Sequence, residues 1–347
     1  WRLFNEENIV NKIEWAVGEV KKWDKNHPIT TNIMMHLALS GGYSSWSHDT
    51  WGLAEALDEM GMDYYSPLNE KGEYGYHIRD SAAYSLARSQ AKGERFWCLE
   101  IQPTTLIGQW WRPWGFEGKG SKGLRKAGDP RVVSVLTWRP IAYGAKSVIY
   151  WVWKSQIPTM FDLVRPDGSF SEYVDVVKGI SDRIKKASSI LLDAKPYPSD
   201  VAILYSKRTL HLSSRYNMSN MPIQSMLGAF AALWDNRIQV DFVNVDRAIK
   251  GYLTNYKACF APSLYVVEKE LAGSLKKFVE NGGYLYTEAL CGSFDERMEY
   301  SIVPCNGLDE LMLYRNHLAL VEDKPEFTMI KDYGSKKPGA TVPSNSC

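Results

Sequence analysis

Residues 96–103 read FWCLEIQP, an apolar run that ends in one carboxylate, Glu100, and then a polar residue and a proline. A run of this kind is typical of a parallel strand that is buried on both faces. Glu100 would then stand at the carboxyl end of the strand, where barrel enzymes hold their catalytic groups. Trp110, Trp111 and Trp114 follow closely and offer flat apolar surfaces suited to stacking on sugar rings. The stretch therefore predicts a catalytic carboxylate that faces a carbohydrate.

The amino-acid composition indicates which kind of molecule the protein binds. The 347 residues have a formal net charge of +1, which favours neither nucleic acid nor a membrane surface. Thirteen Trp and twenty Tyr in a nearly neutral chain favour an oligo- or polysaccharide over a phosphate ligand. The five Cys and six His lack disulfide or metal-ligand spacing, so no cofactor is expected. No apolar run approaches the roughly 20 residues of a membrane helix.

The first part of the chain, residues 1–195, alternates strands with helices. This pattern predicts parallel β/α units and the C-terminal part of a (β/α)8 TIM barrel, strands 4 to 8. We expect the first barrel strands to come from an unseen segment before Trp1 or from another chain. Trp1 itself is interpreted as a truncation or processing point, so the sequence does not distinguish a cytoplasmic from a secreted protein. The predicted strands are residues 1–4, 29–35, 62–67, 96–103 and 146–153.

A second unit follows the break at residues 195–198, KPYP. Residues 196–321 again alternate strands and helices, which predicts a flavodoxin-like, doubly wound sheet. A helix within it is expected to end at Asn281-Gly282-Gly283, a common terminator. The remaining residues, 322–347, are polar and are predicted to form an irregular tail.

A retaining glycosidase needs two carboxylates about 5 Å apart, one as nucleophile and one as acid/base. Glu6 follows the short apolar stretch WRLFN and is the best candidate for the second carboxylate. It lies 94 residues before Glu100, which corresponds to about three barrel units of about 30 residues each. Strands that far apart face each other across the mouth of a barrel. We therefore predict that Glu6 and Glu100 share one cleft.

These motifs resemble those of glycoside hydrolase clan A. Asn5-Glu6 is similar to the acid/base motif on the clan's fourth strand, and Glu100 falls where the clan has its nucleophile. More narrowly, Glu100-Ile101-Gln102-Pro103 resembles the nucleophile segment of family 42, the β-galactosidase-like enzymes. Residues 29–34 and 150–154 are similar to the family's fifth and eighth strands, and residues 201–321 to its amidotransferase-like trimerisation domain.

The resemblance implies a role for each candidate residue. Glu100 would attack the anomeric carbon, Glu6 would act as acid and then base, and Asn5 would bind the sugar 2-hydroxyl. The chain would form a homotrimer. The other expected substrate contacts are Gln102, Trp110, Trp151, Tyr65 and Asp162, with Trp151 as the floor of the subsite.

The sequence departs from the family between residues 153 and 165, where the family has a Glu and a His that bind galactose. Here Asp162 is the candidate replacement for the Glu, and no His is present. The basic insertion at residues 112–129 is interpreted as a solvated loop in preference to a site for an anionic glycan. Two alternatives stay open: a non-catalytic carbohydrate-binding relative, and an assembly module that chiefly forms the trimer. Cys291, in the place of an amidotransferase nucleophile, is interpreted as inert.

Overall fold

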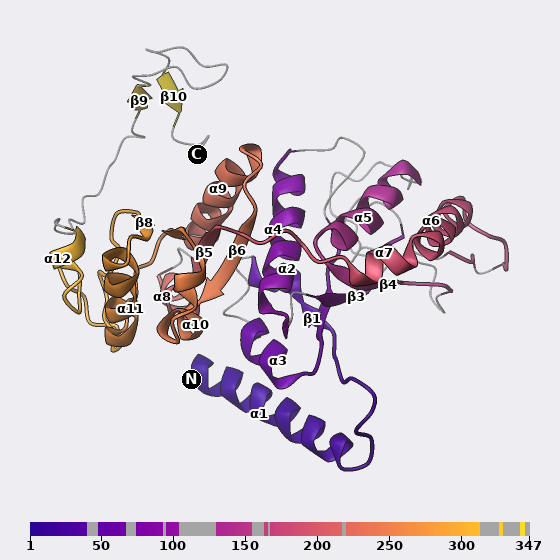
Figure 1. Ribbon diagram of the computed structural model, residues 1–347, viewed down its shortest axis with the longest axis horizontal. Helices are drawn as coiled ribbons and strands as arrows, with labels where there is room; N and C mark the ends of the chain where they lie inside the picture. The colour runs from indigo at the N-terminus through magenta and orange to yellow at the C-terminus, as the bar shows by residue number, and fades with distance from the viewer. Residues whose placement is uncertain are drawn as a thin grey trace, which may run out of the picture.

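The computed structural model describes residues 1–39, 48–66, 74–92, 95–103, 130–154, 163–165, 167–216 and 220–312, together with two short strands near the C-terminus (Figure 1). Within these residues two separate four-stranded parallel sheets follow one another along the chain. A two-stranded antiparallel pair, β9 (Glu326–Thr328) and β10 (Thr341–Pro343), lies apart from both.

The first sheet contains four parallel strands in the order β1-β2-β3-β4. Consecutive strands that pair in chain order, with helices between them, form a segment of a β/α barrel. Gly61 in β2 lets the strands approach, because a Cβ there would lie 2.5 Å from the Thr31 carbonyl oxygen. The register of β2 on β3 shifts at Met62/Asp63 and pairs Asp63 with Glu100. The strands are β1 (Ile33–Met34), β2 (Met60–Asp63), β3 (Phe96–Ile101) and β4 (Ala145–Tyr150).

Helices pack around this sheet. α3 begins at a side-chain cap, because Asp49 accepts hydrogen bonds from the backbone N–H groups of Trp51 and Gly52. α4 contacts β2 and also reaches the second sheet at β6, so it is buried on several sides. The helices are α1 (Arg2–Lys21), α2 (Met35–Ala38), α3 (Thr50–Ala56), α4 (Tyr74–Gln90), α5 (Pro130–Ala142), α6 (Val174–Lys186) and α7 (Ser188–Asp193).

The second sheet has the order β6-β5-β7-β8, all parallel, as the doubly wound prediction requires. α11 ends at Glu280, and Gly282 follows with a φ of +90° that glycine adopts readily. The strands are β5 (Val201–Tyr205), β6 (Val240–Asn244), β7 (Ala258–Ala261) and β8 (Tyr284–Thr287). The helices are α8 (Lys207–Arg215), α9 (Met221–Asp235), α10 (Val245–Ile249), the 3-10 helix η4 (Tyr252–Asn255), α11 (Lys269–Glu280) and α12 (Asp309–Met312).

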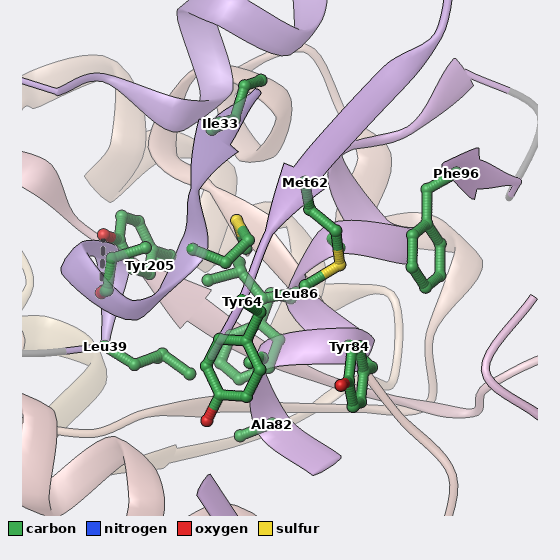
Figure 2. Close-up of a cluster of buried hydrophobic side chains, with 14 of the residues drawn as sticks. Ile33, Leu39, Met62, Tyr64, Ala82, Tyr84, Leu86, Phe96 and Tyr205 are labelled. Carbon is green, nitrogen blue, oxygen red and sulfur yellow. Dashed lines mark hydrogen bonds between the residues drawn. The ribbon is translucent and has the colours of Figure 1, made fainter. Parts of the chain in front are cut away.

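One apolar core joins the two sheets. Figure 2 shows Tyr64, Tyr84 and Phe96 of the first sheet region in the same buried cluster as Tyr205 of β5. The Tyr205 hydroxyl donates to the Ala38 carbonyl oxygen at 3.1 Å. Burial of this much apolar surface fixes the two units against each other. The domain limits at residues 195 and 321 stay predictions.

The structure contradicts the strand predicted at residues 1–4. These residues lie in the first turn of α1, a helix of 20 residues. A short apolar run cannot be assigned to strand or helix by periodicity alone, and here the helical stripe that continues it decides the outcome. Ile9, Ile13 and Val17 pack against the core from this helix. A strand forms in each of the four later predicted ranges, with different bounds: β2 begins two residues and β4 one residue earlier than predicted, and β1 is only Ile33–Met34.

Candidate active site

Glu100 lies near the carboxyl end of β3 and is half-buried. Its Oε2 accepts a hydrogen bond from Asn32 Nδ2 at 2.9 Å, and its Oε1 accepts one from the Tyr65 hydroxyl. Asn32 directly precedes β1, and Tyr65 lies two residues after β2. Three neighbouring strands therefore bring these side chains together, and both carboxylate oxygens are held in fixed directions.

A second carboxylate, Asp63, lies beside this group. It pairs with Glu100 in the register of β2 on β3, and its Oδ1 is buried without a hydrogen-bond partner in the part of the chain that the structure describes. Burial, and then the negative charge of Glu100, raises the pKa of Asp63 to about 7. Asp63 therefore holds its proton up to about neutral pH.

Trp151 lies at the same end of the sheet. Its backbone N–H donates to the Ile101 carbonyl oxygen at 2.8 Å, which extends the pairing of β3 with β4. The side chain is 47% exposed, and the peptide bond to Val152 is cis. An exposed indole at the strand end that carries Glu100 offers an apolar surface, so its role as the floor of a sugar subsite stays a prediction.

Comparison with known proteins matches both halves of the chain. A family model described as "Beta-galactosidase", of glycoside hydrolase family 42, matches residues 1–160. A second model of that family, described as "Beta-galactosidase trimerisation domain", matches residues 199–312. The chain belongs to glycoside hydrolase family 42.

Curated relatives of this family 42 chain are distant in sequence. It is 24% identical over 307 residues to β-galactosidase BgaP of Planococcus sp. (strain L4), covering 85% of this chain and 40% of the relative. It is 26% identical over 324 residues to β-galactosidase BgaH of Haloferax lucentense, covering 88% of this chain and 44% of the relative. The chain thus spans less than half the length of these relatives.

Solved structures share the fold. A β-galactosidase from Bacillus circulans sp. alkalophilus superposes with a TM-score of 0.78 at 20% identity, over 98% of this chain and 48% of that chain. A family 42 exo-carrageenase from Bacteroides ovatus superposes with a TM-score of 0.65 at 14% identity, over 88% of this chain and 41% of that chain. At these identities the likeness establishes the fold alone, part of a TIM barrel followed by an α/β domain.

The structure places Glu6 and Asn5 away from Glu100, which contradicts their predicted roles. Both lie in the first turns of α1. The Glu6 carboxyl is fully buried, with Oε1 2.9 Å from Nε2 of His211 in α8. In Figure 1 the N-terminal end of α1 lies near α8 and α10, and β3 lies elsewhere. The acid/base assignment is wrong because it depended on a strand that is the start of a helix.

Gln102 also differs from its prediction. It is 1% exposed, its Nε2 donates to the Ser66 carbonyl oxygen at 2.8 Å, and its Oε1 accepts from the Ser66 N–H at 3.2 Å. Because both ends of the amide hold the backbone of Ser66, Gln102 joins the segment after β2 to the segment after β3. Gln102 therefore positions the Ser66 backbone, and its buried side chain cannot contact a sugar directly.

Three of the remaining predicted features lie outside the described residues, and the burial of Cys291 bears on a fourth. Trp110, Asp162 and the insertion at 112–129 lie outside the described residues. Among the residues described, no group of three or more metal-ligating side chains occurs, and no helix has the length and apolarity to cross a membrane. Cys291 is fully buried, and burial raises its pKa to about 12, so its thiol is poorly suited to act as a nucleophile.

Asn32 and Asp63 were missed as site residues by the sequence analysis. Asp63 is the one carboxylate at the end of β2, and a polar residue there is a usable signal because parallel strands bring their carboxyl ends to one edge. Asn32 directly precedes β1, inside the predicted strand, and carries no such signal.

The protonation of Asp63 makes a prediction for stability. Its pKa is about 7 in the folded chain against 3.8 in the unfolded chain, so from pH 4 to 7 only the unfolded chain loses this proton. Stability therefore falls across that window. The difference corresponds to about 4 kcal/mol at most, and access of water to this half-buried group reduces it to about 1–2 kcal/mol.

Asp63→Asn should remove this loss. The thermal midpoint of the variant, relative to wild type, should be higher at pH 8 than at pH 4.5. Asp167→Asn is the control, because hydrogen bonds from Ser169 lower the pKa of that exposed carboxyl below its ordinary value, so its effect on the midpoint should be nearly the same at pH 4.5 and pH 8. An Asp63 variant whose midpoint follows the wild-type pH profile would show that Asp63 is ionised throughout.

Proposed function

We propose that this chain carries the nucleophile and part of the substrate site of a retaining glycoside hydrolase acting on β-linked sugars, as a β-galactosidase-like enzyme. The observation that carries the proposal is Glu100 at the end of a barrel strand, with its two carboxylate oxygens held by Asn32 and Tyr65. A carboxylate with fixed oxygens is prepared for attack on one carbon atom.

In the first step Glu100 forms a bond to the anomeric carbon as the glycosidic C–O bond breaks, and a second carboxylic acid gives its proton to the leaving oxygen. In the second step that carboxylate takes a proton from water, the water oxygen attacks the anomeric carbon, and the bond to Glu100 breaks. Tyr65 and Asn32 orient the Glu100 oxygens through both steps.

The acid/base carboxylate lies outside the described residues in this proposal. Glu6 pairs with His211, and Asp63 lies on the neighbouring strand, paired in register with Glu100. A retaining reaction needs its second carboxylate across the glycosidic bond. Strands that complete the ring from β1 to β4 would supply it, from another segment or another chain.

The proposed substrate is a β-linked oligo- or polysaccharide. The named relatives are β-galactosidases, and the structural neighbour from Bacteroides ovatus is an exo-carrageenase. Both names suggest galactose-containing glycans as the first class to test. Trp151 is the proposed floor of the subsite, and Trp110 and Asp162 stay proposed contacts.

We also propose a homotrimer formed through the second unit. Residues 199–312 match the family's trimerisation domain, and β8 at the sheet edge exposes Tyr284 and Tyr286. Exposed aromatic side chains on an edge strand are typical of a surface that another chain covers. Sedimentation of the full-length protein should give three times the protomer mass, and a monomer at micromolar concentration would contradict the trimer.

A non-catalytic carbohydrate-binding relative is the second candidate. It is favoured by one observation, that Glu6, the predicted acid/base, is buried in α1 beside His211. Such a protein would bind sugar without hydrolysing it.

Hydrolysis of an activated aryl β-galactoside by the full-length protein, followed by NMR as the product forms, separates these possibilities. Retention predicts that the β-anomer appears first and then mutarotates. Appearance of the α-anomer first would exclude double displacement. Binding without turnover, measured by calorimetry with the same glycoside and with other aryl glycosides, would favour the non-catalytic relative.

A further inference from the structure

Another buried carboxylate, Asp80, lies next to the residues around Glu100 and is closed to solvent. Asp80 of α4 is fully buried. Its Oδ1 accepts a hydrogen bond from the Tyr64 hydroxyl at 2.9 Å, and its Oδ2 accepts one from the Ser66 hydroxyl at 2.6 Å. Nη1 of Arg139, in α5, lies 2.6 Å from Oδ2. Asp80 thus binds the two residues that flank Tyr65.

The same short segment is held from the other side. Gln102 holds both backbone groups of Ser66, and the Tyr64 N–H donates to the Glu100 carbonyl oxygen at 3.2 Å. Tyr65 lies between these anchors, and its hydroxyl donates to Glu100. The direction of the Tyr65 side chain is therefore set by the residue before it and the residue after it.

Stability alone gives a weak reason for this arrangement. Burying a carboxylate costs several kcal/mol. A buried ion pair, of which Asp80–Arg139 is an example, often stabilises a protein no more than apolar side chains of the same volume would. What apolar side chains do not supply is direction. The hydrogen bonds of Asp80 converge on Tyr64 and Ser66, the neighbours of Tyr65, whose hydroxyl donates to Glu100.

We propose that Asp80 is a positioning residue, which fixes Tyr64 and Ser66 so that the Tyr65 hydroxyl holds the Glu100 carboxylate in the direction of attack. Burial raises the pKa of Asp80, and the ion pair with Arg139 opposes that rise and favours the charged carboxylate. Nη2 of Arg139 also lies 2.5 Å from Nδ1 of His77. This inference rests on the proposed function, because it assigns Asp80 a role in the reaction of Glu100.

Asp80→Asn in the full-length protein tests the inference. The neutral amide loses the charge that pairs with Arg139, and its nitrogen only donates, so the hydroxyl of Tyr64 or Ser66 that it faces must turn to accept; the geometry that holds Tyr65 in place is then disturbed. We expect kcat to fall about 10–100-fold, with KM changed less than about 3-fold. Asp241→Asn is the matched control. It removes the buried ion pair between Asp241 of β6 and Arg88, which lies on α4 like Asp80, and this pair has no link to Tyr65. That control should lower the thermal midpoint and leave kcat within about 2-fold.

The decisive test repeats Asp80→Asn in the Tyr65→Phe variant. If Asp80 acts through the Tyr65 hydroxyl, Asp80→Asn should lower kcat less than about 3-fold once that hydroxyl is absent. Should Asp80→Asn fail to fold, Tyr64→Phe and Ser66→Ala each remove one of its hydrogen bonds, and each should lower kcat several-fold. Full additivity of Asp80→Asn with Tyr65→Phe, or an unchanged kcat in Tyr64→Phe and Ser66→Ala, would overturn the inference.

A crystal structure of Asp80→Asn, or of Ser66→Ala if the first does not fold, gives a readout that needs no turnover. We expect the Tyr65 hydroxyl to move out of hydrogen-bond distance of Glu100. An unmoved Tyr65 would overturn the role of Asp80 and leave the proposed hydrolase intact. A displaced Tyr65 in a protein that hydrolyses no aryl glycoside would support the positioning and count against the hydrolase.

Discussion

Glu100→Gln should reduce the turnover of an activated aryl β-glycoside by the full-length protein on the order of 10⁴-fold or more. The amide keeps the shape of the side chain, and its oxygen still accepts one of the bonds from Asn32 and Tyr65, so the fold should survive. What it loses is the negative charge and the nucleophilic oxygen. Steady-state kinetics with wild-type and variant protein at equal concentrations of folded protein measure the loss.

Two controls make the result specific to the nucleophile. Glu172→Gln removes a carboxylate that pairs with Arg165 at the surface at 2.6 Å, and it should leave kcat unchanged. Glu100→Ala with added azide should recover part of the turnover, because the anion enters the vacated space and attacks the anomeric carbon. A Glu100→Gln variant that keeps more than a tenth of wild-type kcat would exclude Glu100 as the nucleophile.

Glu6→Ala should destabilise the protein by about 3–5 kcal/mol while the activity per folded molecule is kept. The Glu6–His211 pair is buried, with side-chain exposures of 0% and 8%, and it joins α1 to α8 of the second unit. Removing the carboxylate takes a polar group from beside the buried His211 ring and leaves a cavity between the two helices. Thermal unfolding should show a midpoint at least about 5 °C below wild type.

Glu14→Ala is the control on the same helix, because Glu14 is exposed and its loss should change the midpoint little. A double-mutant cycle with His211→Ala should show strong coupling, since either single change already breaks the pair. If Glu6→Ala instead kept the wild-type midpoint and lost activity by orders of magnitude, Glu6 would be the acid/base carboxylate after all, and its place in the fold would have to differ.

The two predictions assign opposite roles to two buried or half-buried glutamates. Glu100 is held by neutral hydrogen-bond donors and has Asp63 beside it, whereas Glu6 faces a histidine of the other unit. A group that is prepared for reaction keeps its charge and its access to substrate, and a group that joins two elements is shielded from water on every side. Burial separates these roles more clearly than residue type does.

Local sequence determined the sheets and most helices. The apolar run at residues 96–101 forms β3 and Asn281-Gly282 ends α11, both as predicted, and the proline at 130 begins α5. Each of these features depends on neighbours within a few residues: continuous apolarity, the missing N–H of proline, and the positive φ that glycine accepts. The position of Glu100 at a strand end follows from the same local pattern.

The tertiary structure alone decided which side chains meet. Asn32 reaches Glu100 across 68 residues, Gln102 reaches Ser66 across 36, and Glu6 reaches His211, which belongs to the other unit. None of these contacts leaves a periodic trace in the sequence, because a hydrogen bond depends on where two separate segments end in space. A four-residue apolar stretch at the start of α1 fits strand and helix equally well, and only the packing of Ile9, Ile13 and Val17 against the core selects the helix.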